Sequence, residues 1–329
     1  MSRPLLTVII PTYNRGTQLE PLLGEFVTVV ETVGSKLQLI VCDNASTDRT
    51  PEILKTHRSV LPAMRIVRRN SNYGMEGNIA CAMLEGDGDY VWVLSDHQQM
   101  CAKGLLRALD VIAKVDFDIG HAKIAQWSSA LPVQEKVIAW SEISRQERGA
   151  LLFSLGNLST LIFRRSLVAP SAKSIFKACY WSYPHLGILS QIKPETRLIE
   201  FRDLSSFPTS NRALNIKTDY DKISVRYCNN LKCVEELSKK ADMAFDRSGF
   251  FTRDYCQSFR FDVLLLLQKK DLTRVAALKS LLPLLPLNPW RLKAVALFVL
   301  ASCVILPRTI RTGLAARARS YRQKRDAFI

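Results

Sequence analysis

The stretch Tyr90-Val-Trp-Val-Leu-Ser-Asp-His-Gln-Gln99 decides the interpretation of this chain of 329 residues. Its first five residues form an apolar run rich in aromatic and β-branched side chains, which is typical of a fully buried strand in a parallel sheet. Ser95 and Asp96 end the run, and open α/β sheets bind their ligands at the carboxyl ends of their strands. An acidic side chain there, beside a histidine and two amides, can hold a metal ion, a sugar hydroxyl or a diphosphate. The alternative is that Asp96 only caps a helix that begins near Lys103.

Strands and helices alternate through the first hundred residues. Apolar runs predict strands at 5–10, 37–42, 64–67 and 90–94, and the periodicity between and after them predicts helices that include 76–84 and 103–114. This alternation indicates a doubly wound α/β unit. A polar cluster follows each strand, and the four clusters are 11–15, 43–48, 70–74 and 95–98. Because parallel strands end at the same edge of a sheet, we expect the four clusters to converge on one ligand site.

The composition is that of a folded and strongly basic protein, with 47% hydrophobic residues, 23% charged residues and a net charge of +16. A basic surface favours nucleic acid, anionic lipid or a negatively charged substrate. No zinc-finger or RNA-binding signature accompanies the charge, so we expect no nucleic-acid partner.

The eight cysteines include no C-x-x-C pair and are interpreted as small hydrophobic residues of a reducing compartment. The chain begins without a signal peptide, which favours a cytoplasmic location.

The second half has a weaker pattern. We expect strands at 119–125 and 157–164, an aromatic loop at 178–186, and helices at 220–237 and 254–269.

The last fifty residues are apolar and then basic. The apolar stretch Ala294–Leu306 has 13 residues, fewer than the ~20 that a helix needs to cross a bilayer, and Trp290 lies before it. We therefore predict an interfacial segment. The basic residues that follow would each add about 1 kcal/mol of attraction to an anionic membrane. They are Arg308, Arg311, Arg317, Arg319, Arg322, Lys324 and Arg325. The alternative is a helical hairpin that packs on the core and carries a solvated basic tail.

Four motifs, taken together, resemble those of family-2 glycosyltransferases of the GT-A fold. They are Val8-Ile-Ile-Pro-Thr-Tyr-Asn14, Asp43-Asn-Ala-Ser-Thr-Asp48, Asn72-Tyr-Gly74 with Asn78, and Gly88-Asp-Tyr-Val-Trp-Val-Leu-Ser-Asp96. Their order and spacing match over roughly the first hundred residues. The second half matches only in outline, and the tail is weakly similar to bacterial O-antigen and exopolysaccharide transferases.

The resemblance implies a GT-A type α/β fold, with a doubly wound, mostly parallel sheet flanked by helices and a C-terminal helical, membrane-facing extension. It also implies that a sugar moves from a nucleotide-sugar donor, with inversion, to a saccharide or polyprenyl-linked saccharide at the inner face of the plasma membrane. On this basis we expect a donor-binding half at 1–115, an acceptor-side half at 116–225, a helical region at 226–280 and a membrane-associating tail at 281–329.

The resemblance also implies roles for single residues. The loop after the first strand would cradle the nucleoside and diphosphate, and Asp43 would hydrogen-bond the base or the ribose. Gly74 would serve backbone geometry. The implied donor-binding residues are Pro11, Thr12, Tyr13, Arg15, Asp43, Asn44, Asn72, Asn78, Ser95 and Asp96.

Asp96 matches the first acidic residue of the Asp-x-Asp signature of the family, in which two carboxylates bind Mg²⁺ or Mn²⁺ and the ion neutralises the diphosphate. Here His97 and Gln98 follow, so the second carboxylate is missing. Three explanations remain open: His97 and Asp96 hold an ion such as Mn²⁺, Asp96 and the diphosphate hold Mn²⁺ or Mg²⁺ weakly, or the site is metal-independent. In the third case the leaving group would be stabilised by cations, and the candidates are Arg15, Arg68 and Arg69. We predict a weak metal site.

An inverting transfer needs a base that takes the proton of the acceptor hydroxyl. His185 lies in the region where the family has a carboxylate, and we predict it as the catalytic base beside Asp96. The alternative is that His185 caps a helix, in which case the candidates for the base are Glu195, Glu200 and Asp203.

Two other functions compete with sugar transfer. A degenerate transferase that binds nucleotide-sugar or glycan without turnover would fit the missing carboxylates. A nucleotidyltransferase would normally have a glycine-rich phosphate loop, and the sequence contains none.

Overall fold

The computed structural model describes residues 3–96, 98–123, 136–148, 158–179, 184–202, 205–206, 235–242 and four positions between 297 and 305. The chain divides into two compact units. The first unit comprises Met1–Leu214 with Glu236–Ala244, and the second comprises Asn215–Glu235 with Phe245–Ile329.

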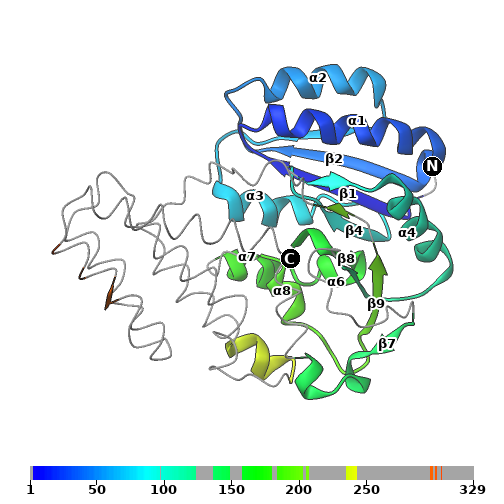
Figure 1. Ribbon diagram of the computed structural model, residues 1–329, viewed down its shortest axis with the longest axis vertical. Coiled ribbons are helices and arrows are strands. Elements are labelled where there is room, and N and C mark those ends of the chain that lie inside the picture. Colours follow the sequence, from blue (N-terminus) through cyan, green and yellow to red (C-terminus); the bar gives the residue numbers. More distant parts are fainter. Residues whose placement is uncertain are drawn as a thin grey trace. The chain divides into compact units, whose positions relative to one another are not determined.

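The first unit contains an eight-stranded sheet (Figure 1). Its strands are β1 (Leu6–Thr12), β2 (Leu37–Asp43), β3 (Arg65–Arg68), β4 (Tyr90–Val93), β6 (Ile119–Lys123), β7 (Ile138–Ala139), β8 (Leu161–Arg164) and β9 (Arg197–Arg202). Their order is β3-β2-β1-β4-β8-β6-β9-β7. The strands from β3 to β4 are parallel, β8 is antiparallel to both of its neighbours, β6 and β9 are parallel, and β7 is antiparallel to β9. The predicted mostly parallel sheet is confirmed.

Helices cover both faces of this sheet (Figure 1). They are α1 (Gly16–Val33), α2 (Thr50–Val60), α3 (Gly74–Met83), α4 (Ala102–Lys114), α6 (Arg165–Val168), α7 (Ala172–Cys179) and α8 (Leu186–Leu189). Apolar side chains of α1, α2 and α4 share one core cluster with β1, β2 and β4. On the other side α3 contacts β1 and β4, and α7 packs against α3.

Burial on both faces explains why the central strands are continuous apolar runs. In β1, Leu6, Val8 and Ile10 point into the core cluster, while the alternate residue Ile9 is also fully buried. Trp92 of β4 is fully buried, and its indole N–H donates to the carbonyl of Ser159 at 2.8 Å. The apolar run that begins at Tyr90 is therefore the buried central strand that its pattern predicts.

Several expected boundaries differ in the structure. The strand expected at 157–164 begins only at Leu161, after a 3-10 turn at Leu158–Thr160. Part of the loop expected at 178–186 is the last turn of α7. The capping alternative for Asp96 is wrong, because Cys101 occupies the N-cap position of α4. The helices expected at 220–237 and 254–269 lie outside the described residues, apart from a helical segment at 235–240.

A short antiparallel pair, β5 (Gln99–Met100) with β10 (Ser205–Ser206), follows the polar end of β4. Glu25 of α1 accepts the backbone N–H of Met100 at 2.7 Å and so ties this segment to α1. Burial raises the pKa of the Glu25 carboxyl above its usual value, and the bond from Met100 offsets part of the rise.

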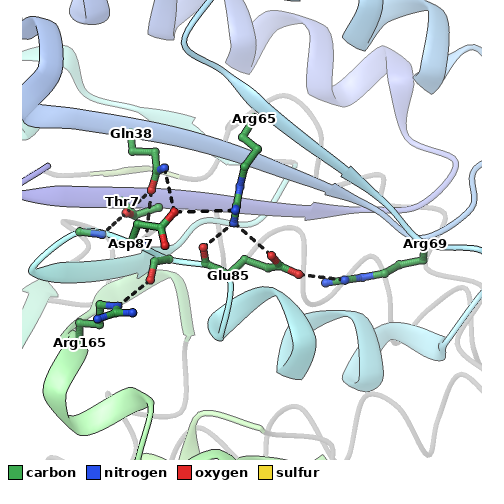
Figure 2. A network of polar contacts seen from close by, with 9 residues as sticks. Thr7, Gln38, Arg65, Arg69, Glu85, Asp87 and Arg165 are labelled. Carbon is green, nitrogen blue, oxygen red and sulfur yellow. Dashed lines mark hydrogen bonds and ion pairs between the residues drawn. The ribbon is translucent and has the colours of Figure 1, made fainter. Parts of the chain in front are cut away.

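A polar network joins β1, β2 and β3 to the turn between α3 and β4 (Figure 2). Glu85 of that turn is its centre, since one carboxylate oxygen lies 3.1 Å from Arg65 and the other 3.0 Å from Arg69. The hydroxyl of Thr7 donates to Gln38 at 2.8 Å, which brings the starts of β1 and β2 together. Only 13% of the Arg69 side chain is exposed, and the Glu85 carboxylate balances the charge of this mostly buried guanidinium.

We expect Glu85→Ala to lower the free energy of unfolding by about 2 kcal/mol, because Arg69 would keep its charge without a carboxylate. Urea denaturation followed by circular dichroism measures the change. Asp110→Ala is the matched control, because its pair with Lys114 is exposed on α4 and such pairs contribute at most about 0.5 kcal/mol. Equal losses in the two variants would contradict the role given to Glu85.

Among the described residues four cysteines are free, namely Cys42, Cys81, Cys101 and Cys179. Burial raises the pKa of the Cys42 thiol to about 12, so this side chain is an uncharged hydrophobic residue at neutral pH.

Candidate functional site

The loops after β1 and β4 meet at Asp96. The hydroxyl of Thr12, the last residue of β1, donates to Asp96 Oδ2 at 2.9 Å. The guanidinium of Arg15, directly before α1, lies with Nη1 3.3 Å from Asp96 Oδ1. The Asp96 side chain is 7% exposed, and that of Arg15 is 40% exposed. A buried carboxylate is thus held by a hydroxyl and a cation that faces solvent.

The loops after β1 and β2 interlock through Asn14. Its backbone N–H donates to Ser46 Oγ at 2.9 Å, and its Oδ1 accepts the N–H of Thr47 at 2.7 Å. Asn14 has φ +51°, a left-handed conformation that asparagine tolerates better than most residues. Asp48 of the second loop accepts the N–H of Gly16, the first residue of α1, at 3.2 Å.

The pKa of the Asp48 carboxyl lies below its usual value. Burial would raise this pKa, but the bonds that Asp48 accepts from Thr50 and Gly16 outweigh burial. Asp48 therefore stabilises the fold above its unfolded pKa, and this contribution is lost as the pH falls through the lowered pKa.

The loops after β2 and β3 interlock through Asn44. Its amide donates to Asn72 Oδ1 at 2.8 Å and to the carbonyl of Gly74 at 3.1 Å, and its Oδ1 accepts the N–H of Tyr73 at 2.9 Å. Gly74 has φ +76°, which confirms its predicted role in backbone geometry. Asn78 of α3 donates to the carbonyl of Cys42 at 3.1 Å. In this structure these amides hold the loops to one another.

Asp43 lies at the end of β2 with its side chain 1% exposed. Its Oδ1 accepts the N–H of Ser46 at 2.9 Å, and its Oδ2 accepts from Nη1 of Arg68 at 3.0 Å. Asp43 and Arg68 line a cavity of about 200 Å³ together with Ile66 and side chains of α2, among them Lys55. The sequence pattern does not indicate the α2 side of this cavity, because Lys55 has the spacing of an exposed helix face.

The remaining predicted donor-binding residues lie around these contacts. Pro11 is half-buried in β1, and Tyr13 is 40% exposed. The backbone N–H of Ser95 donates to Ser159 Oγ at 3.1 Å. Tyr73, which we gave no role, is 49% exposed in the third loop. The structure therefore brings the four polar clusters together as expected, while the contact of each residue with a donor stays a prediction.

Comparison with known proteins agrees with this geometry. Residues 7–159 match the family model of glycosyl transferase family 2. These residues belong to that family. Abequosyltransferase RfbV of Salmonella typhimurium is 34% identical over 116 residues, which are 35% of this chain and 34% of that protein. The undecaprenyl-phosphate 4-deoxy-4-formamido-L-arabinose transferase of Edwardsiella ictaluri is 31% identical over 91 residues, 27% of this chain and 28% of that protein. The chain thus matches about a third of the length of these relatives.

The fold also matches solved glycosyltransferases of the GT-A type. A mannosyltransferase from Pyrobaculum calidifontis, solved with GDP-mannose and Mn²⁺, has a TM-score of 0.50 and 15% identity, with 96% of this chain and 85% of that chain covered. At this identity the likeness concerns the fold. The predicted family and the GT-A type α/β fold of the first unit are confirmed.

In the described part of the segment that matches the Asp-x-Asp signature, one of the two metal-binding carboxylates is missing. Asp96 is the one carboxylate of the signature segment, and Thr12 and Arg15 already contact its two oxygens. Gln98, at the place of the second carboxylate, is 2% exposed and presents a neutral amide. No group of three or more His, Cys, Asp or Glu side chains suited to a metal occurs among the described residues. His97 lies outside them, so the predicted pair of metal ligands, Asp96 and His97, stays a prediction.

His185 stands at the N-cap position of α8 with 1% of its surface exposed. Its backbone carbonyl accepts the N–H of Ile188 at 3.0 Å, but its side chain makes no capping bond. The capping alternative thus holds for the backbone alone, and the role of the ring as a base stays a prediction. Of the other candidates for the base, Glu195 is exposed, Glu200 of β9 lies 3.7 Å from His121 Nδ1 of β6, and Asp203 lies outside the described residues.

Proposed function

We propose that this protein is a glycosyltransferase that moves a sugar from a nucleotide-sugar donor to a saccharide acceptor. The observation that carries the proposal is the series of hydrogen bonds that links the four strand-end loops and includes Asp96 and Asp43. Such an edge of a parallel sheet binds nucleotides in α/β proteins. The membership of residues 7–159 in family 2 supports the same conclusion.

Asp43 and Asp96 would contact different parts of the donor. Asp43 and Arg68 offer an acceptor and a donor beside the cavity, which suits the hydrogen-bonding edge of a nucleobase or a ribose hydroxyl. The exposed ring of Tyr13 offers a face on which a base can stack. Thr12, Arg15 and Asp96 would lie at the diphosphate. The nucleoside therefore occupies the β2–β3 side of the edge and the sugar the β4 side.

Transfer proceeds with inversion in this proposal. The acceptor oxygen attacks the anomeric carbon, the bond from that carbon to the diphosphate breaks, and a base takes the hydroxyl proton. His185 is the proposed base. Because its surface is 1% exposed, neighbouring groups must move before a hydroxyl reaches the ring. His185→Gln should therefore lower kcat and leave nucleotide affinity unchanged.

The acceptor is proposed to be lipid-linked and used in bacterial cell-surface polysaccharide synthesis, with the protein at the inner face of the plasma membrane. The name of the Edwardsiella relative contains undecaprenyl phosphate, which supports this class of acceptor. We keep the assignment of 1–115 to the donor, 116–225 to the acceptor, 226–280 to a helical region and 281–329 to the membrane. No described helix is long and apolar enough to cross a membrane.

The described positions of the tail support contact with a lipid surface. Leu297, Phe298 and Ile305 are helical, and they are 50%, 52% and 75% exposed. Their spacing places them on one side of a helix, and seven basic residues follow between 308 and 325. An exposed apolar face next to cations fits an anionic membrane surface.

We expect the protein to sediment with vesicles that contain phosphatidylglycerol and to be released by high salt. The double variant Leu297→Asp with Ile305→Asp should bind these vesicles at least about tenfold more weakly, because two charges would enter the lipid-facing side. Val60→Asp, at an apolar position of α2 that is 57% exposed, is the control and should bind normally. Equal binding by all three proteins would contradict the role of the tail.

Calorimetric titration with UDP, GDP, CDP and dTDP tests the proposed function. We expect one nucleotide to bind with a 1:1 ratio and the others to bind at least about tenfold more weakly, because the base edge must match the groups beside the cavity. Asp43→Ala should remove this preference. The proposal is wrong if none of the four binds, either with Mn²⁺ or with chelator.

A degenerate protein of the same fold, which binds nucleotide-sugar or glycan without turnover, is the second candidate. Gln98 and His185 favour it, because they stand where the family has carboxylates. Sugar transfer that depends on Asp96 would exclude this candidate.

A further inference from the structure

The ion pair between Arg15 and Asp96 lies in the segment that corresponds to the metal-binding signature of the family. A divalent ion in such a signature meets two carboxylates, which balance its charge. Here one carboxylate is present in the described part of the segment, and a guanidinium already balances it. An added divalent ion would meet one shared carboxylate and a neighbouring positive charge.

The protein itself engages both oxygens of Asp96. Thr12 donates to Oδ2 at 2.9 Å and Arg15 contacts Oδ1 at 3.3 Å, within a side chain that is 7% exposed. Each carboxylate oxygen has two lone pairs, so a metal ion about 2.0–2.1 Å from Oδ1 would share that oxygen with the Arg15 guanidinium. The ion and the guanidinium would then be two like charges close together in a half-buried site, which is unfavourable.

Arg15 is placed to contact a diphosphate. Its side chain is 40% exposed, and a guanidinium has five N–H donors in a planar fork that matches phosphate oxygens. Of the other two candidate arginines, Arg68 pairs with Asp43 beside the cavity proposed for the nucleoside, and Arg69 pairs with Glu85 in the turn before β4. The N–H of Gly16 at the start of α1 is bound to Asp48.

We infer that the Arg15 guanidinium, held by Asp96, takes the place of the divalent ion, so that this domain binds the diphosphate of its donor without a metal. The inference rests on the proposed function. When the bond between the anomeric carbon and the diphosphate oxygen breaks, its electron pair leaves with the nucleoside diphosphate. The N–H donors of Arg15 stabilise that added negative charge, while the acceptor proton goes to the base. Asp96 acts as a positioning residue.

The test is a calorimetric titration with whichever of UDP, GDP, CDP and dTDP binds, carried out in EDTA and in millimolar Mn²⁺. We expect the two Kd values to agree within about twofold. Arg15→Ala should weaken binding in EDTA by at least about tenfold, because charge-assisted hydrogen bonds to phosphate are lost. Arg15→Lys should recover part of the loss. Arg3→Ala removes the same charge from the exposed pair with Asp89 and should bind as the wild type does.

Two further readouts separate this role from a structural one. In a double-mutant cycle on Kd in EDTA, Asp96→Asn and Arg15→Ala should be strongly non-additive, because Asp96 acts through Arg15. In electron paramagnetic resonance, the signal of free Mn²⁺ should fall no further with protein and nucleotide than with nucleotide alone. This readout and the EDTA comparison use the wild-type chain, so they remain decisive if Arg15→Ala does not fold.

The outcomes distinguish the inference from the proposed function. Binding that tightens tenfold or more in Mn²⁺, or Mn²⁺ held by protein and nucleotide together, overturns the inference and leaves the transferase in place. Unchanged binding by a folded Arg15→Ala variant also overturns the inference. If no nucleotide binds in either buffer, the proposed function itself fails, and the inference falls with it.

Discussion

Asp96→Ala is expected to reduce the rate of sugar transfer by about 10²–10³-fold, the usual cost of losing one preorganised stabiliser of the leaving group. Asp96 accepts from Thr12 and pairs with Arg15, so its removal releases both groups at once. The side chain is buried among these partners and not in the apolar core, so the fold should survive. Release of nucleoside diphosphate, measured with a donor and a saccharide acceptor, gives the rate.

Asp89→Ala is the matched control for Asp96→Ala. Asp89 directly precedes β4, whereas Asp96 follows that strand. The side chain of Asp89 forms an exposed pair with Arg3. Its removal should leave transfer within about twofold, because exposed pairs contribute little. Transfer by Asp96→Ala at more than a tenth of the wild-type rate would show that Asp96 is not part of the reaction site. A wild-type protein that binds nucleotide and transfers no sugar would favour the degenerate candidate.

Arg148→Ala is expected to lower the free energy of unfolding of the first unit by about 1–3 kcal/mol, the usual cost of leaving buried acceptors without their donor. Nε of Arg148 donates to the carbonyls of Trp140 at 3.0 Å and Ile143 at 2.9 Å. Its Nη1 donates to the carbonyl of Asp242 at 3.0 Å and to the carboxylate of that residue at 3.1 Å, and Nη2 donates to the carbonyl of Ser141 at 3.3 Å. Alanine would leave the carbonyls of Trp140 and Ile143, which accept in buried bonds, without this donor.

Arg145→Ala is the control for Arg148→Ala, because Arg145 pairs with the same residue, Asp242, at 3.2 Å but is 68% exposed. It should cost less than about 1 kcal/mol. Urea denaturation of both variants followed by circular dichroism compares them. Equal losses would show that the contact with Asp242 matters and that the buried carbonyls do not. A second contact, from the indole of Trp140 to the carbonyl of Ala241 at 2.8 Å, holds the same segment and should limit fraying in Arg148→Ala.

The contacts of Arg148 illustrate what local patterns leave out. Its partner Asp242 lies 94 residues further along the chain, and no periodicity within a window of the sequence brings the two together. The pairing of β8 between β4 and β6 is equally non-local, because β8 follows β6 in the chain and yet separates it from β4. Local sequence patterns predict both strands, but they do not determine the positions of these strands in the sheet.

In the candidate site, too, local patterns predict some features, and other features depend on contacts between residues far apart in the chain. The polar clusters at the ends of β1, β2, β3 and β4 could be predicted to meet, because the carboxyl ends of parallel strands lie at the same edge of a sheet. The pairing of Asp43 with Arg68 and of Asp96 with Arg15 could not, since the first pair joins the ends of two strands and the second joins two loops that are far apart in the chain. The side of the cavity formed by α2 was likewise missed, because Lys55 has the spacing of a solvated face.

The sequence by itself determined the strand and helix order of the first hundred residues, the edge of the sheet where polar groups gather and the family to which residues 7–159 belong. These features depend on periodicity, burial and spacing along the chain, which are local properties. Only the tertiary structure decided that Asp43 and Asp96 are both held by arginines, and that residues 236–242 belong to the first unit. Those outcomes depend on which charged groups are buried next to one another, and the chain brings such groups together only when the whole unit folds.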